Sequence, residues 1–176
     1  ARAAVIVNIS ADHFGEYGIH DLSGLADVKL TVARALNQEG VLVLNADDAV
    51  LMQKAGRFKC RHAYFSMHES NLHIAQLKES GGTVCELINS RLYLNDLDLG
   101  AISDMPLSMN GSAQYNIENL AAAACIAFSL GVELAAIKTT MQHFGSLNSD
   151  NPGRLQRWKV GGASVLIDYA HNPEGL

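Results

Sequence analysis

The most constraining stretch of this sequence is an apolar run near its start that ends in a polar turn. Residues 3–9 are mainly Ala, Val and Ile, the pattern of a strand buried on both faces of a parallel sheet. Asn8, Ser10, Asp12 and His13 crowd the end of this run. Ligands in open α/β sheets bind at the carboxyl ends of strands, so the turn is a candidate site.

The helix predicted after this turn carries a lysine on its apolar face. Asp21 is a suitable N-cap, and Lys29 falls within the arc formed by the apolar positions Leu22, Leu25, Ala26, Ala33 and Leu36. An uncompensated buried ammonium costs several kcal/mol. Lys29 must therefore extend to solvent, lose its charge, or meet anionic or metal-linked partners.

The order strand, polar turn, helix then repeats. Residues 41–44 predict a second buried strand, followed by Asp47, Asp48 and a helix that ends near Ala55. Residues 63–65 predict a third strand, which gives a βαβαβ series with right-handed crossovers. A turn-forming role suffices for the two aspartates.

The pattern changes beyond Gly81. Residues 83–88 and 91–94 alternate in polarity around a turn, which predicts an antiparallel hairpin. Residues 105–109 are expected to be extended, and Asn116 opens an Ala-rich helix that runs to about Leu130. A further helix is predicted over residues 134–144.

A polar segment with Pro and Gly at residues 147–153 reads as a linker. Residues 155–160 and 164–167 then predict a second hairpin. We expect an α/β fold with a mostly parallel sheet flanked by helices and a small antiparallel β insert. The expected domains are residues 1–150 and the truncated start of another α/β domain at 151–176.

Composition limits the classes of function. The net charge of −5 and the scattered basic residues argue against a nucleic-acid partner. No apolar run approaches the roughly 20 residues of a membrane span, and no signal peptide is recognisable. The three cysteines, Cys60, Cys85 and Cys125, are expected to be reduced and packed, so we expect a cytoplasmic protein. Homo-oligomerisation stays open.

Six short motifs, in order over nearly the whole chain, resemble the Mur ligase family. They are NISADH at 8–13, the lysine of LADVK at 29, LNADD at 44–48, YNIENLAAAA at 115–124, NPGR at 151–154 and DYAHNP at 168–173. The family comprises amide-forming ligases that act on muramyl peptides, on folylpolyglutamate or in cyanophycin synthesis. The last two motifs resemble the cyanophycin synthetases most.

The resemblance implies a reaction and two cofactors. Members use ATP to phosphorylate a substrate carboxylate, and an amine then displaces phosphate from the acyl phosphate; Mg²⁺ bridges the nucleotide phosphates. The likeness makes His13 a magnesium ligand and Lys29 a carbamylated lysine, whose anionic oxygens suit a hard metal. From the residues alone, Asp12 either orients His13 or caps the next turn.

The resemblance also implies a nucleotide site. It assigns Asn116 and Asn119 to adenine, whereas from the residue alone Asn116 reads more readily as a helix N-cap, and both roles could coexist. Arg154 is expected to reach phosphate or ribose oxygens, and Asp168 ribose hydroxyls. His171 is the least determined candidate, because its Asn-Pro neighbours suffice for a turn. The expected partners are a carboxylate-bearing small molecule or peptide and an amino acid.

The chain also departs from the family pattern. No G-x-x-x-x-G-K-[ST] phosphate loop occurs within its 176 residues. We therefore expect a fragment that is inactive alone, with the loop upstream of Ala1 in the parent protein. Two alternatives remain: a ligase for a muramyl peptide or folate-type chain, or a non-catalytic module that keeps the fold for nucleotide binding.

Overall fold

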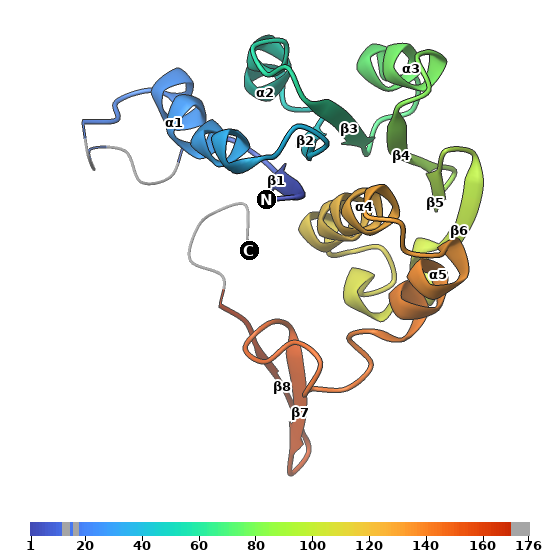
Figure 1. Cartoon of the computed structure of the whole chain (residues 1–176). Coiled ribbons are helices and arrows are strands. Elements are labelled where there is room, and N and C mark those ends of the chain that lie inside the picture. Colours follow the sequence, from blue (N-terminus) through green and yellow to red (C-terminus); the bar gives the residue numbers. More distant parts are fainter. Residues whose placement is uncertain (12–14, 16–17, 170–176) are drawn as a thin grey trace.

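The protein contains one six-stranded sheet and one separate hairpin (Figure 1). A computed structural model describes residues 1–11, 15 and 18–169. The order in the large sheet follows the chain, with the strands β1 (Ala3–Ile6), β2 (Val41–Asn45), β3 (Arg61–Ser66), β4 (Thr83–Ile88), β5 (Arg91–Leu94) and β6 (Leu97–Ala101). Strands β1 to β4 are parallel, and β5 and β6 are antiparallel. The expected mixed α/β fold is confirmed.

Helices cover both faces of this sheet. Figure 1 shows α1 to α3 on one face and α4 and α5 on the other. Their bounds are α1 (Leu22–Lys29), α2 (Ala49–Ala55), α3 (Leu72–Glu79), α4 (Gln114–Ser129) and α5 (Leu134–His143). Because each parallel crossover must return the chain to the same edge, a helix or helical turn follows each of the first three strands.

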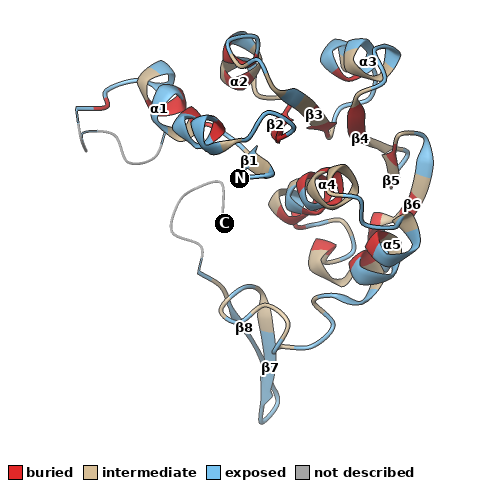
Figure 2. Ribbon diagram, in the orientation of Figure 1, coloured by how far each residue is buried: buried red, intermediate tan, exposed pale blue. Residues whose placement is uncertain are grey.

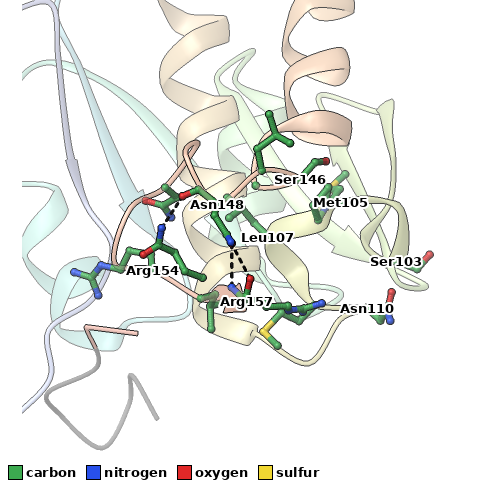
Figure 3. A pocket seen from close by; sticks show the side chains of 15 residues that line it. Ser103, Met105, Leu107, Asn110, Ser146, Asn148, Arg154 and Arg157 are labelled. Carbon is green, nitrogen blue, oxygen red and sulfur yellow. Dashed lines mark hydrogen bonds between the residues drawn. The ribbon is translucent and has the colours of Figure 1, made fainter. Parts of the chain in front are cut away.

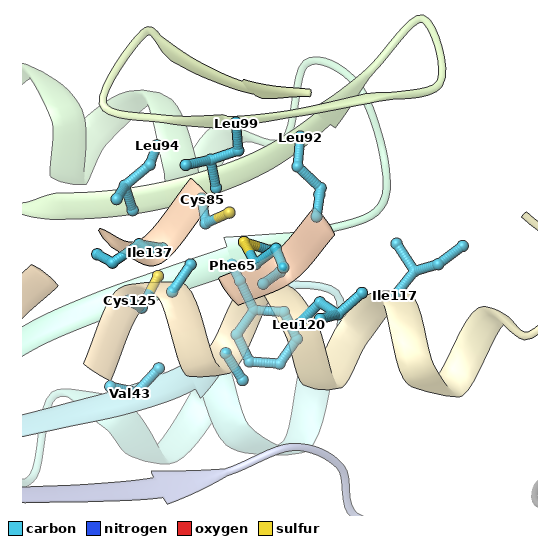
Figure 4. Close-up of a cluster of buried hydrophobic side chains, with 14 of the residues drawn as sticks. Val43, Phe65, Cys85, Leu92, Leu94, Leu99, Ile117, Leu120, Cys125 and Ile137 are labelled. Carbon is cyan, nitrogen blue, oxygen red and sulfur yellow. The ribbon is translucent and has the colours of Figure 1, made fainter. Parts of the chain in front are cut away.

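β2 lies at the centre of the packing, because all five of its residues are buried. Its side chains alternate between two cores, as the period of a strand requires. Val41 and Val43 face the core beneath α4, whereas Leu42 and Leu44 face the core beneath α1 and α2. Red segments in Figure 2 mark this buried layer, and Figure 4 shows the α4 side, where Phe65 packs near Leu120.

An ion pair between a buried lysine and a partly exposed aspartate joins α1 to α2. Lys54 is only 2% exposed, and its Nζ donates to Asp27 Oδ1 at 2.6 Å. Arg57 also donates to this oxygen, at 3.1 Å. The hydrogen bond from Lys54 lowers the pKa of Asp27, which keeps the partner of the buried ammonium charged.

Several expectations about local structure were wrong. The first helix tightens after Lys29 into a 3₁₀ turn, Leu30–Ala35, and so ends before Gly40. Residues 105–109 are not extended, because 3₁₀ turns occur at Ile102–Asp104 and Pro106–Ser108. The Ala-rich helix begins at Gln114, two residues before Asn116. Helix α3 and strand β6 were not predicted.

The second hairpin forms its own small sheet. Strands β7 (Gln156–Val160) and β8 (Ala163–Ile167) pair antiparallel around the predicted Gly turn. Nearly all of its residues are exposed, including the apolar Val160 and Leu166. The cysteines are free thiols, and Cys85 and Cys125 are buried as expected. Among the described residues, no helix is long and apolar enough to cross a bilayer.

Replacing Phe65 with Ala should lower the free energy of unfolding by about 3–5 kcal/mol, because this fully buried ring bridges the sheet and α4. Urea unfolding followed by circular dichroism measures the change. Leu72, which is 74% exposed, provides the control: Leu72→Ala should stay within about 0.5 kcal/mol of wild type. Equal losses of unfolding free energy in the two variants would contradict the burial of Phe65 between the sheet and α4.

Candidate functional site

Polar residues gather where the parallel strands end. Asn8 follows β1, Asp47 and Asp48 follow β2, and His68 follows β3. The carboxyl ends of neighbouring parallel strands meet at one edge of a sheet. Hydrogen bonds join these segments into one connected polar edge.

Asp48 joins two of these segments. Its Oδ1 accepts the amides of Val50 and Leu51, at 2.9 and 3.0 Å, and so caps α2. Its Oδ2 accepts the amide of Ile9 at 2.6 Å, across 39 positions of the chain. The carboxylate therefore both starts a helix and holds the residue that follows Asn8.

Asp47 serves the next turn in a similar way. Oδ1 accepts from the Ser66 hydroxyl at 2.6 Å and from the side-chain Nδ2 of Asn71 at 2.9 Å, and Oδ2 accepts the backbone amide of Met67 at 2.6 Å. Asn71 in turn caps α3 through His73. The interpretation of Asp47 and Asp48 as turn-forming residues agrees with these bonds.

Lys29 lies at the same edge, beside the end of β1. It is the last residue of α1, whose N-cap is Asp21 as predicted, with a 2.7 Å bond from the amide of Gly24. Lys29 is half-buried, and its Nζ donates to the Asn8 carbonyl at 3.4 Å. It also lines a cavity of about 290 Å³ together with Val5, Val32 and their neighbours.

The metal-ligand prediction is only partly covered by the structure. Asp12 and His13 lie outside the described residues, as does His171. Within the described part of the chain, no group of three or more His, Cys, Asp or Glu side chains could hold a metal ion. Lys29 therefore remains the one predicted metal-site residue whose surroundings are visible.

A second group of predicted residues meets at the start of α4. Asn116 occupies the third position of this helix and is buried, and its Nδ2 donates to the Leu107 carbonyl at 2.9 Å. Ala113 is the N-cap, so the reading of Asn116 as a cap was wrong. Asn119 lies about one turn further along and is exposed.

The two ends of the hairpin return to this helix start. Asp168 Oδ2 accepts the Leu155 amide at 2.8 Å, and the Arg154 guanidinium lies 5.2 Å from the centre of the Tyr169 ring. Burial raises the pKa of Tyr115; the charge of Asp168 raises this pKa further, and that of Arg154 lowers it. Arg154 and Asp168 thus lie close to Tyr115, next to Asn116.

A polar pocket of about 490 Å³ opens beside this group (Figure 3). Its walls come from residues 103–110, the turn after α5, and the start of β7. Asn148 holds the walls together, because it exchanges two hydrogen bonds with the Arg157 backbone, at 2.8 and 3.0 Å. In Figure 3 the Arg154 side chain extends away from Ser103 and Asn110.

Sequence reasoning missed Tyr115, Tyr169 and this pocket. Tyr115 belongs to the YNIEN motif, and Tyr169 to DYAHNP, but neither had a spacing that suggested a role. The pocket is formed by loops far apart in the chain, and residues 147–153 read only as a linker. Adjacency to Asn116 and Asp168 was the only usable signal.

The chain belongs to the Mur ligase middle domain family, whose profile matches residues 1–127. Cyanophycin synthetase of Geminocystis herdmanii is 33% identical over 175 residues, which cover 97% of this chain and 20% of that protein. The Nostoc enzyme of the same name is 32% identical over 98% of this chain. The predicted family resemblance is therefore confirmed.

More distant proteins match as well. UDP-N-acetylmuramate–L-alanine ligase of Polaromonas naphthalenivorans is 27% identical to this chain. The match covers 97% of this chain and 35% of that protein. The crystal structure of MurF from Acinetobacter baumannii shares the fold, with a TM-score of 0.58 and 21% identity over 98% of this chain and 35% of that one. The present chain spans about a fifth of the cyanophycin synthetases.

The charges around Tyr115 can be tested by titration. Asp168→Asn should lower the pKa of Tyr115, because it removes a negative charge that disfavours the tyrosinate, whereas Arg154→Met should raise it. The Cζ chemical shift of labelled tyrosine, assigned with Tyr115→Phe, reports the titration. The control is Arg157→Met, because Arg157 is an exposed arginine on the same hairpin. This variant should leave the pKa of Tyr115 unchanged. Shifts of the same sign in both test variants would contradict the arrangement.

Proposed function

We propose that this chain is the nucleotide-binding part of an ATP-dependent amide-forming ligase that acts through an acyl phosphate, most like the cyanophycin synthetases. The support is the similarity to those enzymes over 97% of the chain, together with family membership. The proposed substrates are a carboxylate-bearing small molecule or peptide and an amino acid, joined in the cytoplasm.

The observation that supports the nucleotide site is that the charges of Arg154 and Asp168 both act on Tyr115, in the first turn of α4. Asn116 and Asn119 would bind the adenine, since a carboxamide both donates and accepts hydrogen bonds. Asp168 would accept hydrogen bonds from the ribose, and Arg154 would donate to ribose or phosphate oxygens. His171 is proposed for the same site and lies outside the described residues.

The second proposed element is a magnesium site at the carboxyl end of β1, formed by His13 and a carbamylated Lys29. Lys29 fits this role, because the residue is half-buried, its Nζ donates to the Asn8 carbonyl at the end of β1, and it lines a cavity of about 290 Å³. Addition of CO₂ to this amine would replace a cation by a carboxylate-like oxygen donor. Magnesium bound there would neutralise charge on the nucleotide phosphates.

The proposed domain arrangement places the nucleotide between two domains. Residues 1–150 would form the central domain, and residues 151–176 would begin the C-terminal domain. The separate β7–β8 sheet supports this division. A muramyl substrate is the main alternative, because the UDP-N-acetylmuramate–L-alanine ligases match the same residues at 23–27% identity.

Lys29→Ala, made in a protein that contains this chain, should reduce ATP-dependent amide formation by at least roughly 10–100-fold, the loss typical when only a residue that supports a metal ligand is removed. Phosphate release in the presence of an amino acid and a carboxylate acceptor measures the rate. Lys59→Ala removes an exposed lysine and should leave the rate unchanged. Full activity of Lys29→Ala would contradict the proposed metal site.

Residues 1–176 alone should show no magnesium-dependent ATP turnover above background, because they contain no phosphate-loop motif. A coupled ADP assay on the purified chain measures this. Robust turnover would contradict the assignment of the phosphate loop to another segment. A longer protein that includes this chain and a phosphate loop should form amides. If it does so with no amino acid, the chain is better described as a non-catalytic module that keeps the fold for nucleotide binding.

A further inference from the structure

One peptide group at the end of β1 is held from both sides by side chains of two other elements. The amide of Ile9 donates to Asp48 Oδ2 at 2.6 Å, and the carbonyl of Asn8 accepts from Lys29 Nζ at 3.4 Å. These N–H and C=O groups belong to the same peptide bond. Asp48 comes from the turn after β2, and Lys29 comes from the end of α1.

Helix capping does not account for the contact with Ile9. An N-cap needs one side-chain oxygen for the free amides of the first turn, and Asp48 Oδ1 already accepts those of Val50 and Leu51. The carboxylate of Asp21, which caps α1, accepts only the local amide of Gly24 among the hydrogen bonds between described residues. The second oxygen of Asp48 therefore holds the segment that follows β1, through a charge-assisted hydrogen bond from the Ile9 amide.

The geometry of a peptide bond transmits this contact to Lys29. A trans peptide is planar, and its N–H and C=O point in opposite directions. When Asp48 fixes the N–H of Ile9, it also fixes the direction of the Asn8 carbonyl, toward Lys29. The negative carboxylate faces the positive end of this peptide dipole, and the ammonium of the unmodified Lys29 faces the negative end, so in the uncarbamylated chain the two contacts support each other.

We propose that Asp48 is a positioning residue for Lys29, acting through the Asn8–Ile9 peptide. Asp48 holds the Asn8–Ile9 peptide, and the carbonyl of that peptide helps to place Lys29 Nζ at the polar edge of the sheet. The relevance of this placement to catalysis rests on the proposed function, in which Lys29 is a metal-site residue. Asp48 itself touches neither substrate nor metal in this account.

The test separates the two roles of Asp48, which are to hold the Ile9 amide and to cap α2. Asp48→Asn keeps an oxygen that can cap α2, since Asn is as good an N-cap as Asp, but it turns a donor NH₂ toward the Ile9 amide. Asp21→Asn is the matched control, because it makes the same change at a cap with a purely local bond. Two signals are measured by NMR in the 176-residue chain without nucleotide or metal: amide hydrogen exchange of Ile9, and the Cε chemical shift of Lys29.

In Asp48→Asn we expect about tenfold or faster exchange at Ile9, a displaced Lys29 Cε signal, and unchanged exchange at Val50 and Leu51. Asp21→Asn should change neither Ile9 nor Lys29. The proposal is overturned if Ile9 and Lys29 do not respond, or if Ile9 exchanges faster while Lys29 stays in place, because Asp48 would then be only a structural anchor.

A wild-type measurement keeps the proposal testable if Asp48→Asn does not fold. The scalar coupling across the hydrogen bond from the Ile9 amide to the Asp48 carboxylate should be detectable, and its absence would overturn the proposal. Both experiments are independent of ligase activity. If the parent protein proves not to form amides, but the expected changes at Ile9 and Lys29 are observed, the proposed reaction is wrong and the placement of Lys29 by Asp48 still holds.

Discussion

The complete burial of β2 is the constraint on which the rest of the structure depends. Every residue of this strand is buried, and alternate side chains enter the cores on the two faces of the sheet. Burying two faces requires helices on both, which the crossovers α1 and α2 and the later helix α4 provide. The layered fold follows from one short run, VLVLN.

The end of this strand has a different role, because polar groups cannot continue into either core. Asn45 accepts the amide of Asp47 at 2.9 Å, and Asp47 and Asp48 then bond the segments that follow β3 and β1. These bonds connect three neighbouring strand ends into one polar edge. The proposed metal site at Lys29 uses this edge, whereas the proposed nucleotide residues Asn116, Arg154 and Asp168 gather at the start of α4.

Local patterns predicted most elements but failed where the signal was weak. Helix α3 buries only Ile74, so it has hardly any apolar stripe to detect. Strand β6 follows a tight turn in which Asn95 and Asp96 both have positive φ, a conformation typical of hairpins. Pro106 at the start of a 3₁₀ turn was read as part of an extended segment, although proline suits the first turn of a helix equally well.

The sequence by itself determined the α/β class, the parallel strands with their crossovers, both hairpins, and the family through its ordered motifs. These depend on periodicity, turn residues and short motifs, which are local properties of the chain. Only the tertiary structure decided that Asp48 reaches Ile9, that Asn116 is a buried helix residue rather than a cap, and that Arg154 and Asp168 lie beside Tyr115. Contacts between residues tens of positions apart depend on strand order and packing, which no local pattern encodes.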